Sequence, residues 1–408
     1  MPAVLAPLRR NLDVMPSPVP DRPGLLLRDP YAYAATVVIV PPPLVACLAC
    51  FDGERTELDL RESLVRITGD LNVGELVRHL VDALGTAGFL ENESFAAMKE
   101  QRHRAFAEAP TRRAVHAGSA YPAEPEPLNE TLRRHLEGNS AASVAAAPRP
   151  GLIGIAAPHV SPEGGWDCYG AAYRLLGEEH RDRVFVVLGT SHYGEPGRFG
   201  LTRKPFETPL GRTTVPLALV DRLVAEGGAA VALEDYCHAI EHSIEFQVIF
   251  LQHLFGPAVS VLPVLCGPLD GTEDSSLPDS DADVRRFMSA LAELAAREGD
   301  GLLWVLGVDM AHVGRRYGDR FSARSRRGPL QEVERRDGAR IERIAAGDAD
   351  GFWESIGGHD DLKWCGTSPL YTFLRAAAPL RGELLHYDQW NIDADSVVSF
   401  AGMGFSRA

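Results

Sequence analysis

Positive charge, cysteine and long apolar runs are all scarce in this sequence of 408 residues. The formal net charge is −15. A general nucleic-acid binder is therefore not expected, because it needs a basic face to neutralise phosphates. The same acidity argues against docking on anionic lipid. We attribute the excess of acidic residues to solubility.

No segment is predicted to cross a membrane or to direct export. The most apolar stretch, Ala34–Cys50, is interrupted by Pro41, Pro42 and Pro43 and is too short to span as one helix. The N-terminus lacks an apolar signal-peptide core followed by a small-residue cleavage site. We therefore expect a cytoplasmic protein.

Six cysteines are too few for a disulfide framework, so the thiols are expected to be reduced and free to bind a metal. Cys47 and Cys50 form a C-x-x-C pair, which can be half of a zinc site or a redox pair. No second pair lies nearby, and the flanking residues are apolar. We interpret this pair as helix packing.

The length suggests two domains. Residues 1–23 contain Pro16, Pro18, Pro20 and Pro23 and show little apolar pattern, which predicts a mobile tail. Residues 24–105 are predicted to be a small independent domain. Its clearest helix is marked by apolar residues at helical spacing, namely Leu76, Val77, Leu80, Val81 and Leu84.

Several short helices near an extended Thr36–Val40 segment predict a winged helix for residues 24–105. A winged helix is often a DNA reader, but residues 20–105 hold nine Lys and Arg against thirteen Asp and Glu, so no basic footprint is present. The Asp52-Gly53 turn and the terminal Gly88-Phe89-Leu90 resemble the PqqD-like peptide-binding domains.

Residues 110–408 alternate strand and helix patterns, which predicts an α/β fold with a layered sheet flanked by helices. Continuous apolar runs suit strands buried on both faces at Leu152–Ala157, Val184–Leu188, Val259–Leu265 and Leu302–Gly307. Helical patterns follow at Gly170–Leu176, Ile244–Phe255 and Val284–Ala296. Residues 141–150 and 270–283 are expected to be loops.

Three of these strands end in a polar signature that contains a histidine: His159, His192 and His312. In an open α/β sheet, ligands bind beyond the carboxyl ends of the strands, so the three imidazoles can converge there. One such histidine is usually a turn residue bonded to backbone. Three in the same topological place favour a shared site, because neutral imidazole is the commonest transition-metal ligand.

Two further elements carry chemistry that spacing alone does not decide. A cysteine follows Trp364, but nothing in the pattern selects Cys365 over Cys168 or Cys266, and a lone cysteine is usually a small buried hydrophobe. The segment 241–245 (Glu-His-Ser-Ile-Glu) opens an amphipathic helix, where acidic residues are favoured simply because they lie in the first turn.

Seven separated motifs occur in the order found in the Memo family. They are His116-Ala117-Gly118-Ser119 with Tyr121-Pro122, Ala157-Pro158-His159, Gly189-Thr190-Ser191-His192, Glu241-His242-Ser243-Ile244-Glu245, Asp309-Met310-Ala311-His312, Cys365-Gly366 with Pro369, and Asp395-Ser396-Val397-Val398-Ser399-Phe400-Ala401-Gly402. The sequence therefore resembles this family, in particular its bacterial branch, the AmmeMemoRadiSam system protein B group.

This resemblance implies a fold like the catalytic subunit of class III extradiol dioxygenases. It also implies one mononuclear metal site with His159, His192 and Cys365 as ligands, and a pocket lined by Asp309 and His312. The chain departs from the family pattern at Val160–Trp166, which fits with an insertion, at Thr190, where proline is common, and at Ala120, which replaces an aromatic residue.

Extradiol dioxygenases hold Fe(II) with two histidines and one carboxylate, whereas a thiolate here keeps the charge but is a softer ligand. Fe(II) and Cu(I) are the expected cofactors, with Zn(II) as the alternative. We expect His312 to be the general acid and base and Asp309 to orient or tune it. His242 and Glu241 are expected to support the ligands from a second layer.

Three functions stay open from the sequence. The first is a redox metalloenzyme of unknown substrate, resembling a dioxygenase and acting with the radical SAM and AMMECR-type proteins implied by the system's name. The second is a non-catalytic module whose pocket and residues 24–105 bind a peptide or protein. The third is a zinc hydrolase.

Overall fold

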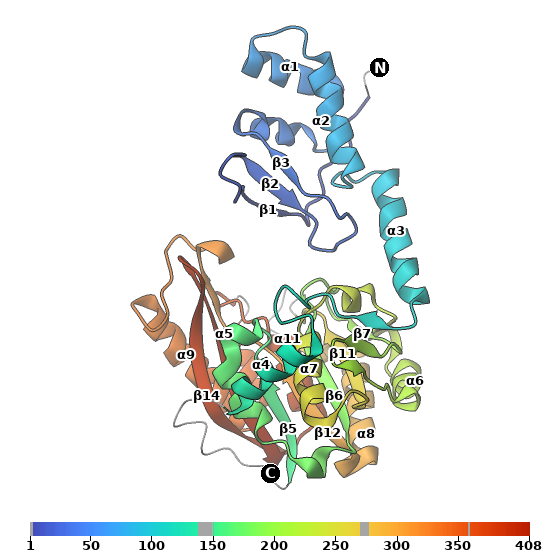
Figure 1. Cartoon of the computed structure of the whole chain (residues 1–408), viewed down its shortest axis with the longest axis vertical. Coiled ribbons are helices and arrows are strands. Elements are labelled where there is room, and N and C mark those ends of the chain that lie inside the picture. Colours follow the sequence, from blue (N-terminus) through green and yellow to red (C-terminus); the bar gives the residue numbers. More distant parts are fainter. Residues whose placement is uncertain (1–2, 138–148, 150, 270–276, 358–359) are drawn as a thin grey trace. The chain divides into compact units, whose positions relative to one another are not determined.

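The computed structural model describes residues 3–137, 149, 151–269, 277–357 and 360–408. The chain divides into two compact units, Met1–Glu108 and Ala109–Ala408 (Figure 1). No helix in the described ranges is both long and apolar enough to cross a membrane. The loops expected at 141–150 and 270–283 lie outside the described residues, except for 149 and 277–283.

The first unit is a small antiparallel sheet followed by helices. Its sheet has the order β1 (Asp13–Pro16), β2 (Leu25–Arg28), β3 (Val38–Val40). The 3-10 helix η1 (Pro42–Cys50) and the helices α1 (Glu57–Thr68), α2 (Gly74–Thr86) and α3 (Glu93–Glu108) follow. Cys47 and Cys50 are buried in the core of this unit, consistent with their interpretation as packing residues.

The prediction of a mobile tail at residues 1–23 is wrong for the described residues 3–23. Leu5 and Arg9 are buried, Arg9 forms a buried ion pair with Asp29 at 2.9 Å, and β1 pairs with β2. The Leu5 N–H donates to the Arg55 carbonyl and the Arg9 N–H to the Phe89 carbonyl, and the proline pattern could not reveal these long-range contacts. The likeness of this unit to a winged helix and to PqqD-like domains stays a prediction.

The second unit contains a large mixed sheet flanked by helices, which confirms the predicted α/β class. Among the described residues, nine strands join in the order β10-β7-β11-β6-β12-β5-β15-β13, with β14 paired to β15. Their bounds are β5 (Leu152–Ala157), β6 (Val184–Thr190), β7 (Phe199–Leu201), β10 (Val231–Leu233), β11 (Val261–Cys266), β12 (Leu302–Gly307), β13 (His312–Gly314), β14 (Leu380–Asp393) and β15 (Ser396–Arg407). A smaller sheet holds β4 (Arg112–Arg113), β8 (Phe206–Thr208) and β9 (Gly211–Arg212).

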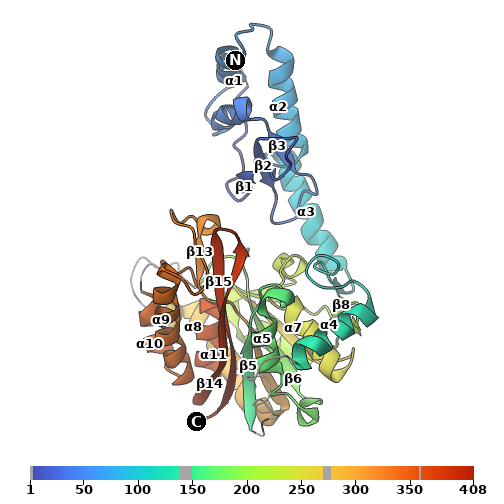
Figure 2. The ribbon, with the colours of Figure 1, turned by 60° about the vertical axis from the view of Figure 1, so that its left-hand side comes forward.

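Helices cover both faces of this sheet, which gives three layers (Figure 2). One face packs on α4 (Pro125–Glu137), α5 (Pro162–Tyr173) and α7 (Glu245–Phe255). The other packs on α6 (Leu217–Glu226), α8 (Ala282–Glu298), α9 (Pro329–Ala345), α10 (Ala349–Ile356) and α11 (Thr367–Ala376). Short 3-10 helices are η3 (Glu178–His180), η4 (Gly228–Ala230), η5 (Tyr236–Ala239), η6 (Pro278–Ser280), η7 (Gly299–Gly301) and η8 (Arg315–Tyr317).

One predicted helix begins earlier than its apolar pattern indicated. The helix expected at Gly170–Leu176 is α5, which starts at Pro162, so most of the apparent insertion at Val160–Trp166 is helical. A Cβ on Gly164 would lie 2.4 Å from the Trp390 ring, so this part of α5 packs closely on β14. The sequence pattern did not predict the first turns of α5, because the adjacent residues Gly164 and Gly165 are poor helix formers.

Three parallel strands end side by side in register. β12 lies between β5 and β6, and its last residue, Gly307, is paired with Ala157 on one side and Gly189 on the other. His159 follows the end of β5 and His192 follows the end of β6. Both histidines are therefore delivered to the same edge of the sheet.

The segment that leads into α7 packs directly on these strand ends. Ser243 Oγ donates to the Thr190 carbonyl at 2.8 Å, and Gln247 Nε2 donates to the Pro158 carbonyl at 2.7 Å. A Cβ on Gly307 would lie 2.2 Å from the Ser243 carbonyl oxygen. The end of β12 therefore requires glycine for this close approach.

We expect Gly307→Ala to lower the free energy of unfolding by about 1–3 kcal/mol, because the added methyl group forces the Ser243 backbone away from the strand end. Gly301→Ala is the matched control, since nothing lies within 4 Å of its Cβ position. That control should change stability by less than about 1 kcal/mol. Urea unfolding of both variants tests this expectation, and equal losses would contradict the tight packing at Gly307.

Candidate metal centre

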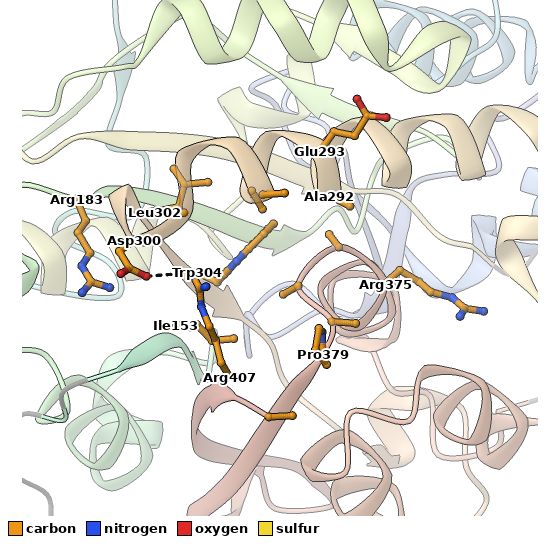
Figure 3. A pocket seen from close by; sticks show the side chains of 17 residues that line it. Ile153, Arg183, Ala292, Glu293, Asp300, Leu302, Trp304, Arg375, Pro379 and Arg407 are labelled. Carbon is orange, nitrogen blue, oxygen red and sulfur yellow. Dashed lines mark hydrogen bonds and ion pairs between the residues drawn. The ribbon is translucent and has the colours of Figure 1, made fainter.

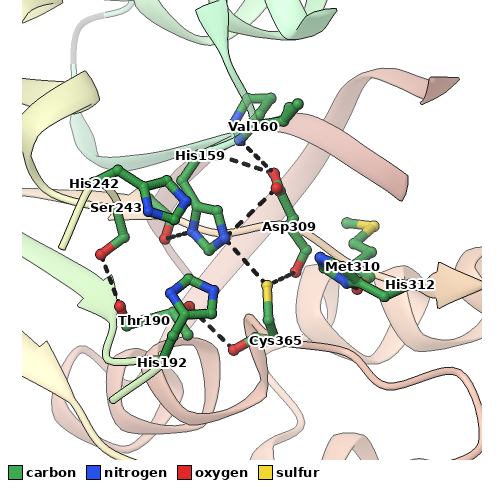
Figure 4. Close-up of polar contacts among 12 residues, drawn as sticks. His159, Val160, Thr190, His192, His242, Ser243, Asp309, Met310, His312 and Cys365 are labelled. Atoms are coloured by element: carbon green, nitrogen blue, oxygen red, sulfur yellow. Dashed lines mark hydrogen bonds and ion pairs between the residues drawn. The ribbon is translucent and has the colours of Figure 1, made fainter. Parts of the chain in front are cut away.

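His159, His192 and Cys365 come together at the carboxyl ends of the strands (Figure 4). One ligand atom of each side chain lies within 4.8 Å of the other two. Cys365 Sγ is 3.2 Å from His159 Nε2. His159 is buried and Cys365 is partly exposed, while His192 is the most exposed of the three with 28% of its side chain accessible, so the group opens to the outside on the His192 side.

In both imidazoles, Nδ1 lies within hydrogen-bond distance of an oxygen. His159 Nδ1 lies 2.9 Å from the Gly307 carbonyl, and His192 Nδ1 lies 3.0 Å from Glu241 Oε2. A hydrogen bond from Nδ1–H to oxygen leaves the Nε2 lone pair for a metal, which is the usual arrangement of metal-binding histidines. With the Cys365 thiolate, these residues form a donor set of two nitrogens and one sulfur that fits a transition metal.

Electrostatics favour the anionic form of the cysteine. Burial alone would raise the pKa of Cys365, but hydrogen bonds and charge from His159 and His192 outweigh it and hold this pKa below its usual value. Burial would also lower the pKa of His192, but Glu241 and Cys365 raise it well above the ordinary value. Both shifts move the metal-free centre towards a thiolate beside a protonated imidazole.

Asp309 is a buried carboxyl group that supports the loop after β5. Its Oδ1 accepts the backbone N–H groups of His159 at 2.9 Å and Val160 at 3.2 Å. Burial raises the pKa of Asp309 to about 6, although His312 and these hydrogen bonds lower it in part. The backbone carbonyl of Asp309 also lies 3.6 Å from Cys365 Sγ and accepts the Gly366 N–H at 3.0 Å. Asp309 thus contacts the loops of two proposed ligands.

His312 begins β13 and lies beside the ligand group. Its Nδ1 is 2.9 Å from the Met310 carbonyl, and its ring packs edge-on against Tyr317 with 5.0 Å between centroids. Burial lowers the pKa of His312, and Asp309 opposes this shift only partly. The charge of Asp309 therefore tunes His312, while the backbone of Met310 orients its ring.

His242 forms a third imidazole next to the ligands. Its ring centroid lies 5.1 Å from both the His159 and His192 rings, and its Nδ1 is 3.8 Å from Glu241 Oε2. Burial and the neighbouring histidines hold the pKa of His242 well below its ordinary value. Glu241, His192 and His242 also have ligand atoms within 4.8 Å of one another. A neutral His242 is thus available as a hydrogen-bonding partner at this edge.

Sequence reasoning missed Arg112, which anchors the segment that precedes the strands. Arg112 is buried, forms an ion pair with Glu245 and donates to the Glu241 carbonyl at 2.6 Å. Glu245 also accepts the Tyr121 hydroxyl at 2.5 Å and the His116 backbone N–H at 3.0 Å. The only signal in the sequence was the position of Arg112 shortly before the His116 motif.

Of two hollows in this unit, one is lined by candidate ligands and the other is not. A cavity of about 420 Å³ is lined by His192 and Cys365 together with Trp353, Lys363 and Trp364. A larger hollow, about 700 Å³, lies at the opposite ends of β5 and β12, where Ile153 and Leu302 contribute to its wall (Figure 3). The smaller cavity is the one that gives access to the candidate metal centre.

Comparisons with known proteins identify the family of this chain. The family model described as Memo-like protein matches residues 112–404. A MEMO1 family protein of Aquifex aeolicus is 29% identical over 386 residues, which cover 93% of this chain and 95% of that protein. A MEMO1 family protein of Pyrococcus furiosus is 30% identical over 316 residues, which cover 73% of this chain and 99% of that protein.

Among solved structures, an uncharacterized protein from Escherichia coli K12 aligns with 62% of this chain and 99% of its own, at a TM-score of 0.38 and 14% identity. The family assignment depends on the sequence matches. Because the family model covers nearly all of the second unit, including the three candidate ligands, this chain belongs to the Memo family, which is related to the class III extradiol dioxygenases.

Proposed function

We propose that this chain is a redox-active metalloprotein in which His159, His192 and Cys365 hold a single metal ion. The observation that carries this proposal is a cysteine with a lowered pKa that shares a 4.8 Å cluster with two histidines. When bound, such a metal supplies Lewis-acid and electron-transfer chemistry. Fe(II) and Cu(I) suit two imidazoles and a thiolate, and Zn(II) is the third candidate.

In this proposal His312 is the general acid and base. Its Nδ1 faces the Met310 carbonyl, so Nε2 is the nitrogen that accepts or releases a proton. Because burial lowers the pKa of His312, the ring is neutral at neutral pH and acts as a base. Asp309 keeps a negative charge nearby that stabilises the protonated ring once it forms.

Substrate is proposed to enter through the 420 Å³ cavity beside Cys365 and His192. Its walls combine the aromatic side chains of Trp353 and Trp364 with hydroxyl groups of Thr190 and Thr367. A cavity of this size, with apolar walls and a few polar groups, suits a small organic molecule. The partly exposed position of Cys365 allows such a molecule to reach the ligand group.

We further propose a reducing, cytoplasmic setting and partners from the AmmeMemoRadiSam system, namely a radical SAM protein and an AMMECR-type protein. Support for the setting comes from the cysteines, all six of which are free. Support for the partners comes from membership of the Memo family. Co-purification of the full chain with these two proteins is the direct test of the partners.

Cys365→Ser should weaken Cu(I) binding by more than about 100-fold, because it replaces a soft anionic ligand with a neutral hydroxyl. Anaerobic competition titrations against a Cu(I) chelator measure the effect. Cys266→Ser is the matched control, since Cys266 lines the same cavity but belongs to neither candidate ligand group of the described residues. That control should keep wild-type affinity.

His312→Ala supplies a second comparison, and its Cu(I) affinity should stay within about tenfold of wild type because it is assigned to proton transfer. If both cysteine variants bound Cu(I) like wild type, the thiolate would not be a dominant ligand. Loss of all Cu(I) binding in His312→Ala would make His312 a ligand and overturn the division of roles.

The raised pKa of Asp309 predicts a pH-dependent loss of stability in the metal-free protein. Burial penalises the charged carboxylate, so ionising Asp309 lowers the free energy of unfolding. The stabilising contribution of the protonated carboxyl is fully present below its ordinary pKa and is lost as the pH rises through about 6. Asp309→Asn removes this loss and keeps an oxygen for the His159 and Val160 N–H groups.

The asparagine variant should therefore match wild type near pH 4 and exceed its stability by up to about 3 kcal/mol at pH 7. Unfolding in urea at both pH values measures the difference. A stability gap that does not change with pH would show that Asp309 titrates in the folded protein much as it does in the unfolded chain.

A further inference from the structure

The strongest concentration of positive charge lies directly after β13. Between residues 315 and 327, which we term the arginine segment, the chain carries six arginines and one aspartate. This composition stands out in a chain whose net charge is −15. All six arginines are exposed, namely Arg315, Arg316, Arg320, Arg324, Arg326 and Arg327.

Most of this charge is not neutralised within the protein. Arg326 pairs with Asp388 at 2.8 Å, whereas no acidic side chain of the described ranges lies within ion-pair distance of the other five arginines. Several exposed arginines on helices elsewhere are neutralised by neighbouring carboxylates. Arg133 pairs with Glu130 and Glu137, and Arg335 pairs with Glu332, each within one helical turn. The arginine segment therefore presents a local positive potential that an external anion can meet.

The backbone that displays these arginines is fixed to the main sheet. The Arg316 N–H donates to Ser396 Oγ at 3.0 Å, and the Arg326 N–H donates to Gln389 Oε1 at 2.7 Å. Between them, Ala323 is buried and its N–H donates to the Asp395 carbonyl at 2.9 Å. A charged surface held in this way loses less conformational entropy on binding than a free loop would.

The segment also lies beside the candidate metal centre. Tyr317 packs against the His312 ring, and Asp319 forms an ion pair at 2.9 Å with Lys363, which lines the cavity next to Cys365. Phe321 is 39% exposed among the arginines. Exposed arginine together with aromatic side chains is the composition enriched at protein–protein interfaces.

These observations favour an acidic polypeptide over other polyanions. A nucleic acid carries its charge far beyond a short contact and would meet the negative surface of a chain of net charge −15. A short run of carboxylates can contact the arginine segment without reaching the negative surface around it. The arginine guanidinium binds a carboxylate through two parallel hydrogen bonds. We propose that residues 315–327 form a docking surface for a carboxylate-rich polypeptide beside the metal centre.

The test uses the full chain and a fluorescent oligoglutamate peptide of about 15 residues, which is long enough to span the segment. Fluorescence anisotropy should detect binding at about 50 mM salt that weakens at about 300 mM. The triple variant Arg320→Glu, Arg324→Glu, Arg327→Glu should bind the peptide at least about tenfold more weakly. These side chains are exposed, so the folded state should persist, and circular dichroism verifies it.

The matched control is Arg10→Glu, Arg22→Glu, Arg61→Glu, which changes net charge equally at exposed arginines outside the segment. It should bind within about twofold of wild type, because the charges it alters do not contact the peptide. No binding by wild type, or equal weakening in both triple variants, would overturn the proposal. Tighter binding of a single-stranded DNA of the same charge would also overturn it, since the surface would then be a nucleic-acid site.

Discussion

The in-register ends of β5, β12 and β6 are the constraint on which the rest of the site depends. Because Gly307 is paired with both Ala157 and Gly189, the chain leaves all three strands at the same level. The residues that follow these strands are therefore placed at the same edge of the sheet. Glycines at these ends let the turn before α7 pack directly on the strands, which brings Glu241 behind His192. The site is thus a consequence of strand pairing rather than of any one loop.

Around this edge, buried charges are arranged in pairs. Arg112 neutralises Glu245 at the start of α7, and Glu241 lies against the His192 ring. Such groups are costly to bury unless each meets a partner of opposite charge or a hydrogen bond. Cys365 completes the pattern, because its thiolate is stabilised by the same imidazoles that would share a metal with it. The charge balance therefore favours a cation between the two histidines and the cysteine.

How much of this the sequence could predict differs between elements. The apolar runs Leu152–Ala157 and Leu302–Gly307 are strands with those same bounds, because a strand buried on both faces needs a continuous apolar run. The start of α5 and the strand β1 were missed, since their stability comes from contacts with Trp390 and β2 rather than from local pattern. Cys365 could not be chosen over Cys266 by spacing. That choice needed the family motifs, because only the fold brings Cys365 next to His159.

The coordination of a metal by His159, His192 and Cys365 can be measured by X-ray absorption at the zinc edge, with the full chain loaded anaerobically with one equivalent of Zn(II). We expect one sulfur at about 2.3 Å and two imidazole nitrogens at about 2.0–2.1 Å from the metal. In Cys365→Ser the sulfur signal should vanish, whereas Cys266→Ser should leave it unchanged. A coordination shell without sulfur in the wild-type protein, or a sulfur signal that survives in Cys365→Ser, would show that Cys365 is not a ligand of the metal.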